Sequence, residues 1–362
     1  MQRKLIHFLV ASFIVAAPLS VATNFYGEEW AKYGRLTSTA LIVLIALLCG
    51  VIGRIGRTTM AYIPFAALWC VSACWSTSPV WGLFYKGMFL LTFLSGVVLA
   101  AQSTQLENVQ QSIRAVCLTA GCAALVAVAL YIANPESSTR LDRLRLEGLN
   151  PNMLAQTAAP LAILCVYGAL YDPRRASRRF AATSFALLVI VMVMSGSRGG
   201  FAMAMIGCGI LIVPVAKRPG FLIVGAGVVF ISAFLAVELM GGFESIRLFE
   251  ELTKDTRSGI WSAGVRQFLE RPVIGHGWYH KGNGWATFQN AYLQVAIETG
   301  VLGLSVIGIG LAGITRRWWI ERRRVEKDKE MMPLVYLSGA CIVASALHGI
   351  AETTFVLGTA LN

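Results

Sequence analysis

Eleven long apolar segments, almost free of charged residues, constrain the fold of this 362-residue chain more than any other feature. Each is about 16 to 25 residues long, the length that an α-helix needs to cross a hydrocarbon core of roughly 30 Å. They lie near residues 5–23, 37–53, 60–75, 83–101, 113–133, 152–171, 180–196, 201–216, 221–240, 291–314 and 333–357. Charged residues make up only 14% of the chain, which excludes an ordinary soluble enzyme. The sequence therefore predicts an all-α, polytopic integral membrane bundle of about 11 to 12 transmembrane helices, with residues 1–362 forming a single transmembrane domain.

The formal net charge of +12 would suggest a nucleic-acid partner in a soluble protein, but the positions of the basic residues predict membrane orientation instead. Arginines gather in alternate loops, as in 174–179 and 316–324, on the side of the N-terminal Arg3 and Lys4. Because cytoplasmic loops are enriched in Lys and Arg, we expect these loops inside, with membrane lipids and not nucleic acid as partners. Residues 241–290 then form one large periplasmic loop that carries part of the functional site. The cysteines imply no disulfide framework and no targeting peptide is visible, so we expect a multi-pass protein of a bacterial inner membrane.

Arg198 lies between two apolar segments on the predicted outer side, in the sequence Ser195-Gly196-Ser197-Arg198-Gly199-Gly200. The nearest acidic residues in sequence, Asp172 and Glu238, are far along the chain. A guanidinium near the hydrocarbon boundary is costly unless it is paired, and the glycines permit a turn whose backbone N–H groups could cradle an anion. Two interpretations stay open: an anion-binding arginine, or an arginine that snorkels from a helix end to the interface.

A second basic group, Arg140, Arg143 and Arg145, precedes the segment at 152–171 on the same predicted side. Asn150-Pro151 is typical of the N-cap and first turn of a helix, so a positive dipole end would face outward there. A phosphate would then meet both arginines and a helix N-terminus. Asn152 and Gln156 place two amides on one face of this helix, either for a ligand or for hydrogen bonds to neighbouring helices.

A third polar group, Asn290, Gln294 and Glu298, has a spacing of four and forms a stripe on the segment at 291–314. Along a continuous helix Glu298 would lie about 12 Å below Asn290. An intramembrane carboxylate is either functional or paired with an arginine. His276 and His280 are also four apart, but the neighbouring glycines disfavour a helix and no third ligand lies nearby in sequence, so we expect no metal site.

Six short motifs follow one another between residues 75 and 310. They are Trp75-Ser76 with Pro79; Asn150-Pro151-Asn152 with Ala155; Ser195-Gly196-Ser197-Arg198-Gly199; Arg257 with Trp261; Pro272 with Gly275 and Gly277; and Asn290 with Tyr292-Leu293-Gln294, Glu298, Gly300 and Gly303. In this order they resemble the O-antigen ligase and polysaccharide polymerase family. The resemblance implies an integral-membrane glycosyltransferase that takes a glycan from undecaprenyl diphosphate on the periplasmic side. It also implies that Arg198 and Arg257 hold the diphosphate.

The chemistry of such a transfer fits these residue types. Negative charge develops on the leaving phosphate, and preorganised arginines can stabilise it in place of a metal, so we expect a metal-independent enzyme without a cofactor. Arg143 and Arg145 are further diphosphate-binding candidates, and Asn152, Gln289, Asn290 and Gln294 are candidates for positioning the substrates. Where the family commonly has His-Asn, this chain has Gln289-Asn290, and Gln cannot accept a proton. The candidate catalytic groups are therefore His280, Glu298, and His348 with Glu352 four residues later; alternatively, positioning alone supplies most of the rate.

Three functions remain open from the sequence. We expect an O-antigen ligase of lipopolysaccharide biosynthesis, with lipid A-core as acceptor. The alternative is an O-antigen or exopolysaccharide polymerase, whose acceptor is a second lipid-linked glycan. A secondary transporter or flippase that uses Glu298, His348 and Glu352 is disfavoured, because the arginines cluster outward and not near the bilayer midplane.

Overall fold

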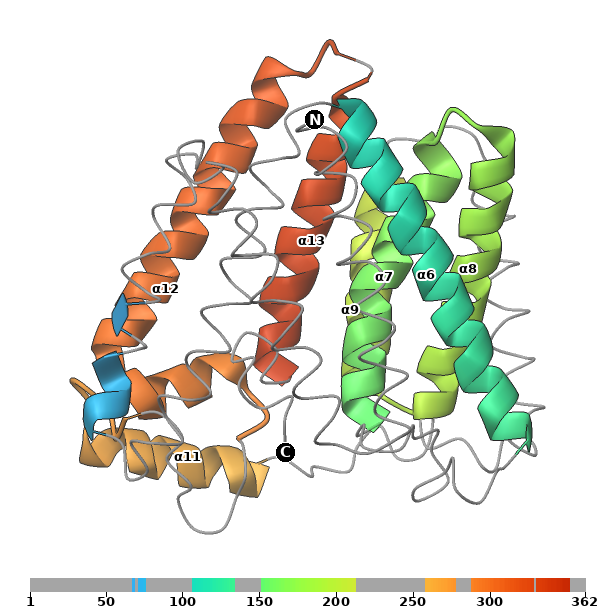
Figure 1. Cartoon of the computed structure of the whole chain (residues 1–362). Coiled ribbons are helices and arrows are strands. Elements are labelled where there is room, and N and C mark those ends of the chain that lie inside the picture. The colour runs from blue at the N-terminus through green and yellow to red at the C-terminus, as the bar shows by residue number, and fades with distance from the viewer. Residues whose placement is uncertain are drawn as a thin grey trace, which may run out of the picture. The chain divides into compact units, whose positions relative to one another are not determined.

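The computed structural model describes residues 67–68, 71–75, 106–133, 151–212, 258–277, 288–328 and 330–351. In these ranges the regular elements are all helical, as predicted (Figure 1). They are η3 (Ser72–Trp75), α6 (Leu106–Ala133), α7 (Pro151–Tyr171), α8 (Arg175–Ser195), α9 (Arg198–Ile212), α11 (Ser258–Glu270), α12 (Ala291–Arg324) and α13 (Met332–Ala351).

Five helices in the described ranges are long and apolar enough to cross a membrane. They are Val109–Ala133, Leu154–Tyr171, Arg175–Ser195, Ala291–Arg324 and Met332–Ile350. α9 is apolar too, but it has only 15 residues. Together these helices match six of the predicted spans. The predicted spans at 5–23, 37–53, 60–75, 83–101 and 221–240 lie wholly or largely outside the described residues, as does most of the predicted loop at 241–290, so the total number of crossings stays a prediction.

The chain divides into two compact units. One consists of Met1–Ser38, Gln105–Thr253 and Arg324–Ala344, and its described helices are α6 to α9 with most of α13. The other consists of Thr39–Thr104, Lys254–Arg323 and Ser345–Asn362, and its described parts are η3, α11, nearly all of α12 and the last turns of α13.

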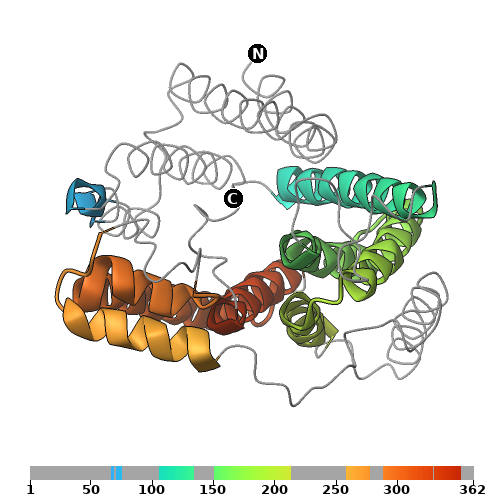
Figure 2. The same cartoon turned by 90° about the horizontal axis from the view of Figure 1, so that it is seen from below.

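α7 is the central helix of the first unit. It packs against α6, α8 and α9, and Figure 2 shows it between them in an end-on view. Small side chains permit this close packing, because Ala155, Ala159, Ala162 and Cys165 of α7 are completely buried. α7 and α8 are connected by a short turn and run antiparallel (Figure 1). The start of α7 and the end of α8 therefore lie at one end of this bundle, and the turn that connects the two helices lies at the other end.

In the second unit α11 packs against the beginning of α12. α11 buries Ile260, which forms a small apolar cluster with Phe288 and Ile297. The helices approach closely at Gly264, where an added Cβ would lie 2.7 Å from Leu293 Cδ2. Figure 1 shows the first turns of α12 lying alongside α11, and the rest of α12 rising away from it.

α12 is not the continuous helix that the sequence predicted over 291–314. Its backbone leaves the helical region at Gly300, where φ is 66° and ψ is −160°. The break follows Glu298, so the predicted rise of about 12 Å from Asn290 to Glu298 along the helix still applies. The depth of Glu298 in a membrane stays a prediction. Beyond the break the helix continues past residue 314, as far as Arg324.

Candidate functional site

The turn between α8 and α9 is fixed by local hydrogen bonds. α8 ends at Ser195, and Gly196 adopts the left-handed conformation with φ 59°, which glycine tolerates best. The Gly196 N–H donates to the Val193 carbonyl at 2.9 Å. The Ser195 hydroxyl donates to the Met192 carbonyl at 2.7 Å. The predicted tight turn is therefore confirmed, and it is built by Ser195 and Gly196.

Arg198 is the first residue of α9 and is exposed. Ser197 precedes it as the N-cap: its hydroxyl oxygen accepts from the Gly200 N–H at 3.4 Å, and its carbonyl accepts from the Phe201 N–H at 3.0 Å. The Arg198 side chain is therefore attached at the N-terminus of α9, the positive end of the helix dipole, where an anion is favoured.

The same turn lies against the first turns of α7. A Cβ added to Gly200 would lie 2.6 Å from the Cβ of Ala155, so the two backbones are almost in contact. Asn152 is three residues before Ala155 on α7, and its side chain is half-buried. The structure therefore brings together two regions that the sequence treated separately, those of Arg198 and Asn152. Arg143 and Arg145, which precede α7, lie outside the described residues.

In the second unit, the turn at 271–277 fills the break in α12. A helix loses backbone hydrogen bonds wherever it is interrupted, and these groups need new partners. Four backbone hydrogen bonds supply them: His276 N to Ile297 O (2.8 Å), Gly277 N to Glu298 O (3.0 Å), Val301 N to Pro272 O (2.8 Å) and Leu302 N to Val273 O (3.4 Å). N–H groups of the turn thus donate to carbonyls of α12 before the break, and carbonyls of the turn accept from N–H groups of α12 after the break.

Three glycines make this arrangement possible. Gly275, Gly277 and Gly300 have φ values of 69°, 84° and 66°, a region that costs other residues about 1–2 kcal/mol. A Cβ on Gly300 would overlap the Val273 carbonyl, and a Cβ on Gly275 would overlap the backbone at Glu298. The motif of Pro272, Gly275 and Gly277 and the break at Gly300 are therefore in direct backbone contact with each other.

Gln294 and Glu298, two members of the predicted polar stripe, bind each other. The Gln294 side-chain N–H donates to Glu298 Oε1 at 2.7 Å, and its Oε1 accepts from the Phe288 N–H at 3.4 Å. The two residues are only 4% and 2% exposed. Because the backbone carbonyl of Glu298 also binds Gly277, this residue is held through both its side chain and its main chain.

Gln289 and Asn290 shape the beginning of α12. The Asn290 side-chain oxygen accepts from the Leu293 N–H at 2.9 Å, which caps the helix. Gln289 has φ 50°, and it is the single non-glycine with positive φ among the described residues. Such a conformation in a residue with a long side chain is uncommon and often marks a functional position.

His276 has a structural role that the sequence did not reveal. Its Nε2 lies 2.8 Å from the Gln267 carbonyl oxygen, and because a carbonyl can only accept, this nitrogen carries the proton. The Glu270 carboxylate lies 3.8 Å away. His276 therefore joins α11 to the turn at 271–277. Within the described ranges, no group of three or more His, Cys, Asp or Glu side chains could hold a metal ion.

His348 is on α13 and is 3% exposed. The hydroxyl of Tyr292, in the first turn of α12, donates to the Ala346 carbonyl at 2.8 Å, which places α12 next to this part of α13. The other predicted site residues, Arg257, His280 and Glu352, lie outside the described residues.

Trp261, known from the sequence only as a motif residue, has a buried indole N–H with no hydrogen-bond partner within the described part of the chain. A buried, unsatisfied donor is costly, so it is a candidate contact for a substrate oxygen.

Comparison with known families gives one match. A family model described as O-antigen ligase matches residues 183–308. The matched region contains the turn with Arg198, helix α11, the turn at 271–277 and the break at Gly300. The family resemblance inferred from the motifs is thereby confirmed. A comparison with curated proteins found no match.

Proposed function

Because residues 183–308 match a family model described as O-antigen ligase, and five described helices are long and apolar enough to cross a membrane, we propose that the chain is a periplasm-facing, metal-independent glycosyltransferase. It transfers a glycan from undecaprenyl diphosphate to lipid A-core in the inner membrane. The observation that carries the proposal is that the family match includes both polar arrangements described above. One is the turn with Arg198; the other, which we call the clamp, is the turn at 271–277 with its four backbone hydrogen bonds to α12 on either side of Gly300.

In the proposed reaction, Arg198 binds the diphosphate of the donor. Its exposed position at the start of α9 combines a guanidinium with the positive end of a helix. In the sequence Arg257 immediately precedes Ser258, the first residue of α11. Arg143 and Arg145 come shortly before α7, whose first turns pack against Gly200. These arginines would stabilise the negative charge that develops on the leaving diphosphate.

We assign proton removal from the acceptor hydroxyl to His280. Of the three candidate bases, Glu298 and His348 are at most 3% exposed, and Glu298 already binds Gln294. His280 follows Gly277 by three residues in the sequence, and the Gly277 N–H donates to the Glu298 carbonyl. Glu298 and Gln294 then act as positioning residues that hold Gln289 and Asn290 at the acceptor.

Deletion of the gene, followed by gel analysis of surface glycan, tests the proposal. Long glycan chains that stay on the lipid carrier and do not reach lipid A support a ligase. Single-repeat glycan on lipid A would overturn the ligase assignment in favour of a polymerase. Loss of lipid-linked glycan from the periplasmic side would instead indicate a transporter. Complementation with the wild-type gene must restore the glycan pattern.

A further inference from the structure

α11 and the turn that follows it expose four large apolar side chains. Val265 and Leu269 lie about one helical turn apart on α11, and Val273 and Ile274 follow in the turn at 271–277. Leu269 and Val273 are 65% and 62% exposed. Apolar side chains that are exposed together, and not singly, mark a contact with a partner or a membrane. We call these four side chains the α11 patch.

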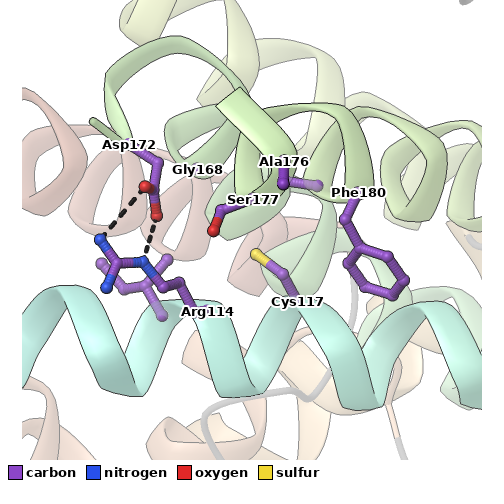
Figure 3. Close-up of a pocket in the computed structure, with 9 residues that line it drawn as sticks. Arg114, Cys117, Gly168, Asp172, Ala176, Ser177 and Phe180 are labelled. Carbon is purple, nitrogen blue, oxygen red and sulfur yellow. Dashed lines mark hydrogen bonds and ion pairs between the residues drawn. The ribbon is translucent and has the colours of Figure 1, made fainter. Parts of the chain in front are cut away.

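Exposed apolar side chains are ordinary on a helix that crosses a membrane, because lipid covers them. Phe180 on the candidate span α8 is an example: it is exposed, and Figure 3 shows its ring across a pocket from the paired Arg114 and Asp172. α11 has only 13 residues and is not one of the five candidate spans among the described helices. A membrane crossing therefore does not explain the α11 patch.

The exposed half of α11 is divided into an apolar side and a charged side. At 3.6 residues per turn, Val265 and Leu269 lie within about 40° of each other around the helix axis. The half-buried Phe268 continues this apolar side. Arg266 and Glu270, both exposed, are centred about 100° away on the other side. This division is typical of a helix that lies in the plane of a membrane surface, with one side in lipid and the other in water.

The clamp joins the α11 patch to the exposed apolar side of α12. The Val301 N–H donates to the Pro272 carbonyl and the Leu302 N–H donates to the Val273 carbonyl, so the two backbones are adjacent. Val301 and Leu302 are exposed, and Ile309, further along α12, is 74% exposed. Because α12 is long and apolar enough to cross a membrane, these side chains face lipid in a membrane. The lipid-facing surface of α12 thus continues onto the α11 patch.

The length of α12 after the break places the α11 patch at a membrane boundary. Near the far end of α12, Arg322 Cζ lies 5.8 and 5.4 Å from the ring centres of Trp318 and Trp319. Tryptophan and arginine at the end of an apolar helix are typical of a membrane–water interface. From Trp319 back to Gly300 the helix spans 19 residues, about 28 Å, whereas a hydrocarbon core is roughly 30 Å thick. The opposite boundary therefore falls at the break, beside Val273.

We propose that the α11 patch is a lipid-binding surface, and that α11 and the turn lie along the membrane with the patch in contact with phospholipid acyl chains. Helices of this kind sink about 5–10 Å into the boundary between head groups and acyl chains. Arg266 and Arg271 are exposed next to the patch, and their long side chains can reach lipid phosphates. In the predicted orientation the lipid belongs to the periplasmic leaflet.

This lipid contact has a consequence for the proposed transfer site. α11 packs against the beginning of α12 through Ile260, Phe288 and Ile297, so a lipid-bound α11 also holds Gln289 and Asn290 at the membrane surface. A diphosphate that is attached to a lipid lies at the same height. The lipid contact itself does not depend on the transfer reaction, and its test needs no activity.

The test measures the depth of single positions in the full-length protein, reconstituted in vesicles of phosphatidylethanolamine and phosphatidylglycerol. The fluorescent amino acid acridonylalanine replaces Leu269, Val273, Glu270 or Ile309, one at a time. Two quenchers are compared: iodide on both sides of the membrane, and lipids that carry a nitroxide either near the head group or near the chain end. Glu270 is the matched control, because it is the neighbour of Leu269 on the charged side of α11, and Ile309 reports the middle of the span.

We expect the head-group nitroxide to quench the labels at 269 and 273 at least about threefold more than the label at 270, which iodide should quench best. The chain-end nitroxide should quench the label at 309 best. Iodide quenching at 269 and 273 as strong as at 270 would show that the patch faces water, and would overturn the proposal. Protection of both positions from both quenchers would show that protein covers the patch, and would overturn it equally. Each labelled protein must keep the wild-type unfolding midpoint, and either patch position decides the question if the other label disturbs folding.

Discussion

At the scale of single residues, the account depends on the geometry of arginine as well as on its charge. Arg198 is exposed at the first position of α9, directly after an N-cap serine. A guanidinium can bind two phosphate oxygens at once, whereas a lysine ammonium acts as a point charge. This difference separates a diphosphate-binding arginine from one that only reaches the membrane interface, because snorkelling needs charge alone.

We therefore predict that Arg198→Lys lowers transfer activity about 100-fold while the protein remains inserted at normal level. The measurement is glycan transfer in membranes, normalised to the amount of protein by immunoblot. Arg316→Lys, the same change at an exposed position of α12, serves as the control and should keep full activity. Full activity of Arg198→Lys would favour the snorkelling interpretation.

The proposed base leads to a second prediction. His280→Ala should abolish transfer at every pH while the donor still binds, because the arginines hold the diphosphate independently of proton removal. Glu298→Gln should keep most of the activity, since an amide oxygen can still accept the hydrogen bond from Gln294. The pH dependence of transfer in the wild type and both variants provides the measurement.

Gln289→His completes this series. A gain of activity in Gln289→His without any loss in His280→Ala would contradict the assignment of His280, and would show that the acceptor normally reacts without a histidine. A loss in Glu298→Gln as large as that in His280→Ala would instead make Glu298 the proton acceptor.

At the scale of the elements, the clamp around Gly300 predicts which glycines cannot be replaced. Gly300→Ala places a Cβ against the Val273 carbonyl and requires a left-handed alanine, so we expect a loss of about 1–3 kcal/mol of stability and a large loss of transfer activity. Gly308→Ala is the matched control in the same helix, because nothing lies within 4 Å of its added Cβ, and it should be neutral or slightly stabilising. Thermal unfolding in detergent measures both; equal shifts in the two variants would argue against the clamp.

The same clamp illustrates why the sequence could predict the helices but not this break. The apolar segments at 152–171 and 180–196 agree with α7 and α8 to within five residues at each end, and the segment at 333–357 begins within one residue of α13, because length and apolar composition determine such helices. Gly300 interrupts a segment equally rich in apolar residues, and glycines at Gly303, Gly308 and Gly310 do not break the helix. The partners that satisfy the broken backbone, at 272–277, are more than twenty residues away in sequence.

The sequence predicted the local parts of the candidate site but not the contacts between residues that are distant in the sequence. The turn at Arg198 is local, so its serines and glycines predicted its geometry. The contact of Gly200 with Ala155 and the pairing of Arg114 with Asp172 depend on how distant helices pack, and no spacing in the sequence encodes them. Gln294 and Glu298 were correctly placed on one face, but their mutual hydrogen bond and complete burial required the structure.

At the scale of the whole molecule, the account predicts an orientation. A reporter that is active in the periplasm should be active when fused after Asn362 or within 241–290, and inactive within the connection between α12 and α13. The reason is that the eleven predicted spans, starting in the cytoplasm as predicted, would end outside, and that arginine-rich connections stay inside. An inactive fusion after Asn362 together with an active one within 241–290 would mean ten or twelve crossings.

The most direct test of the central claim is glycan transfer by the purified protein in vesicles. The substrates are undecaprenyl diphosphate-linked glycan and lipid A-core, and the product is lipid A-core that carries the glycan. The account predicts transfer by the wild type, and about 100-fold less by Arg198→Lys although it is equally well folded. Efficient release of the glycan onto a second lipid-linked glycan, or equal transfer by Arg198→Lys and the wild type, would contradict it.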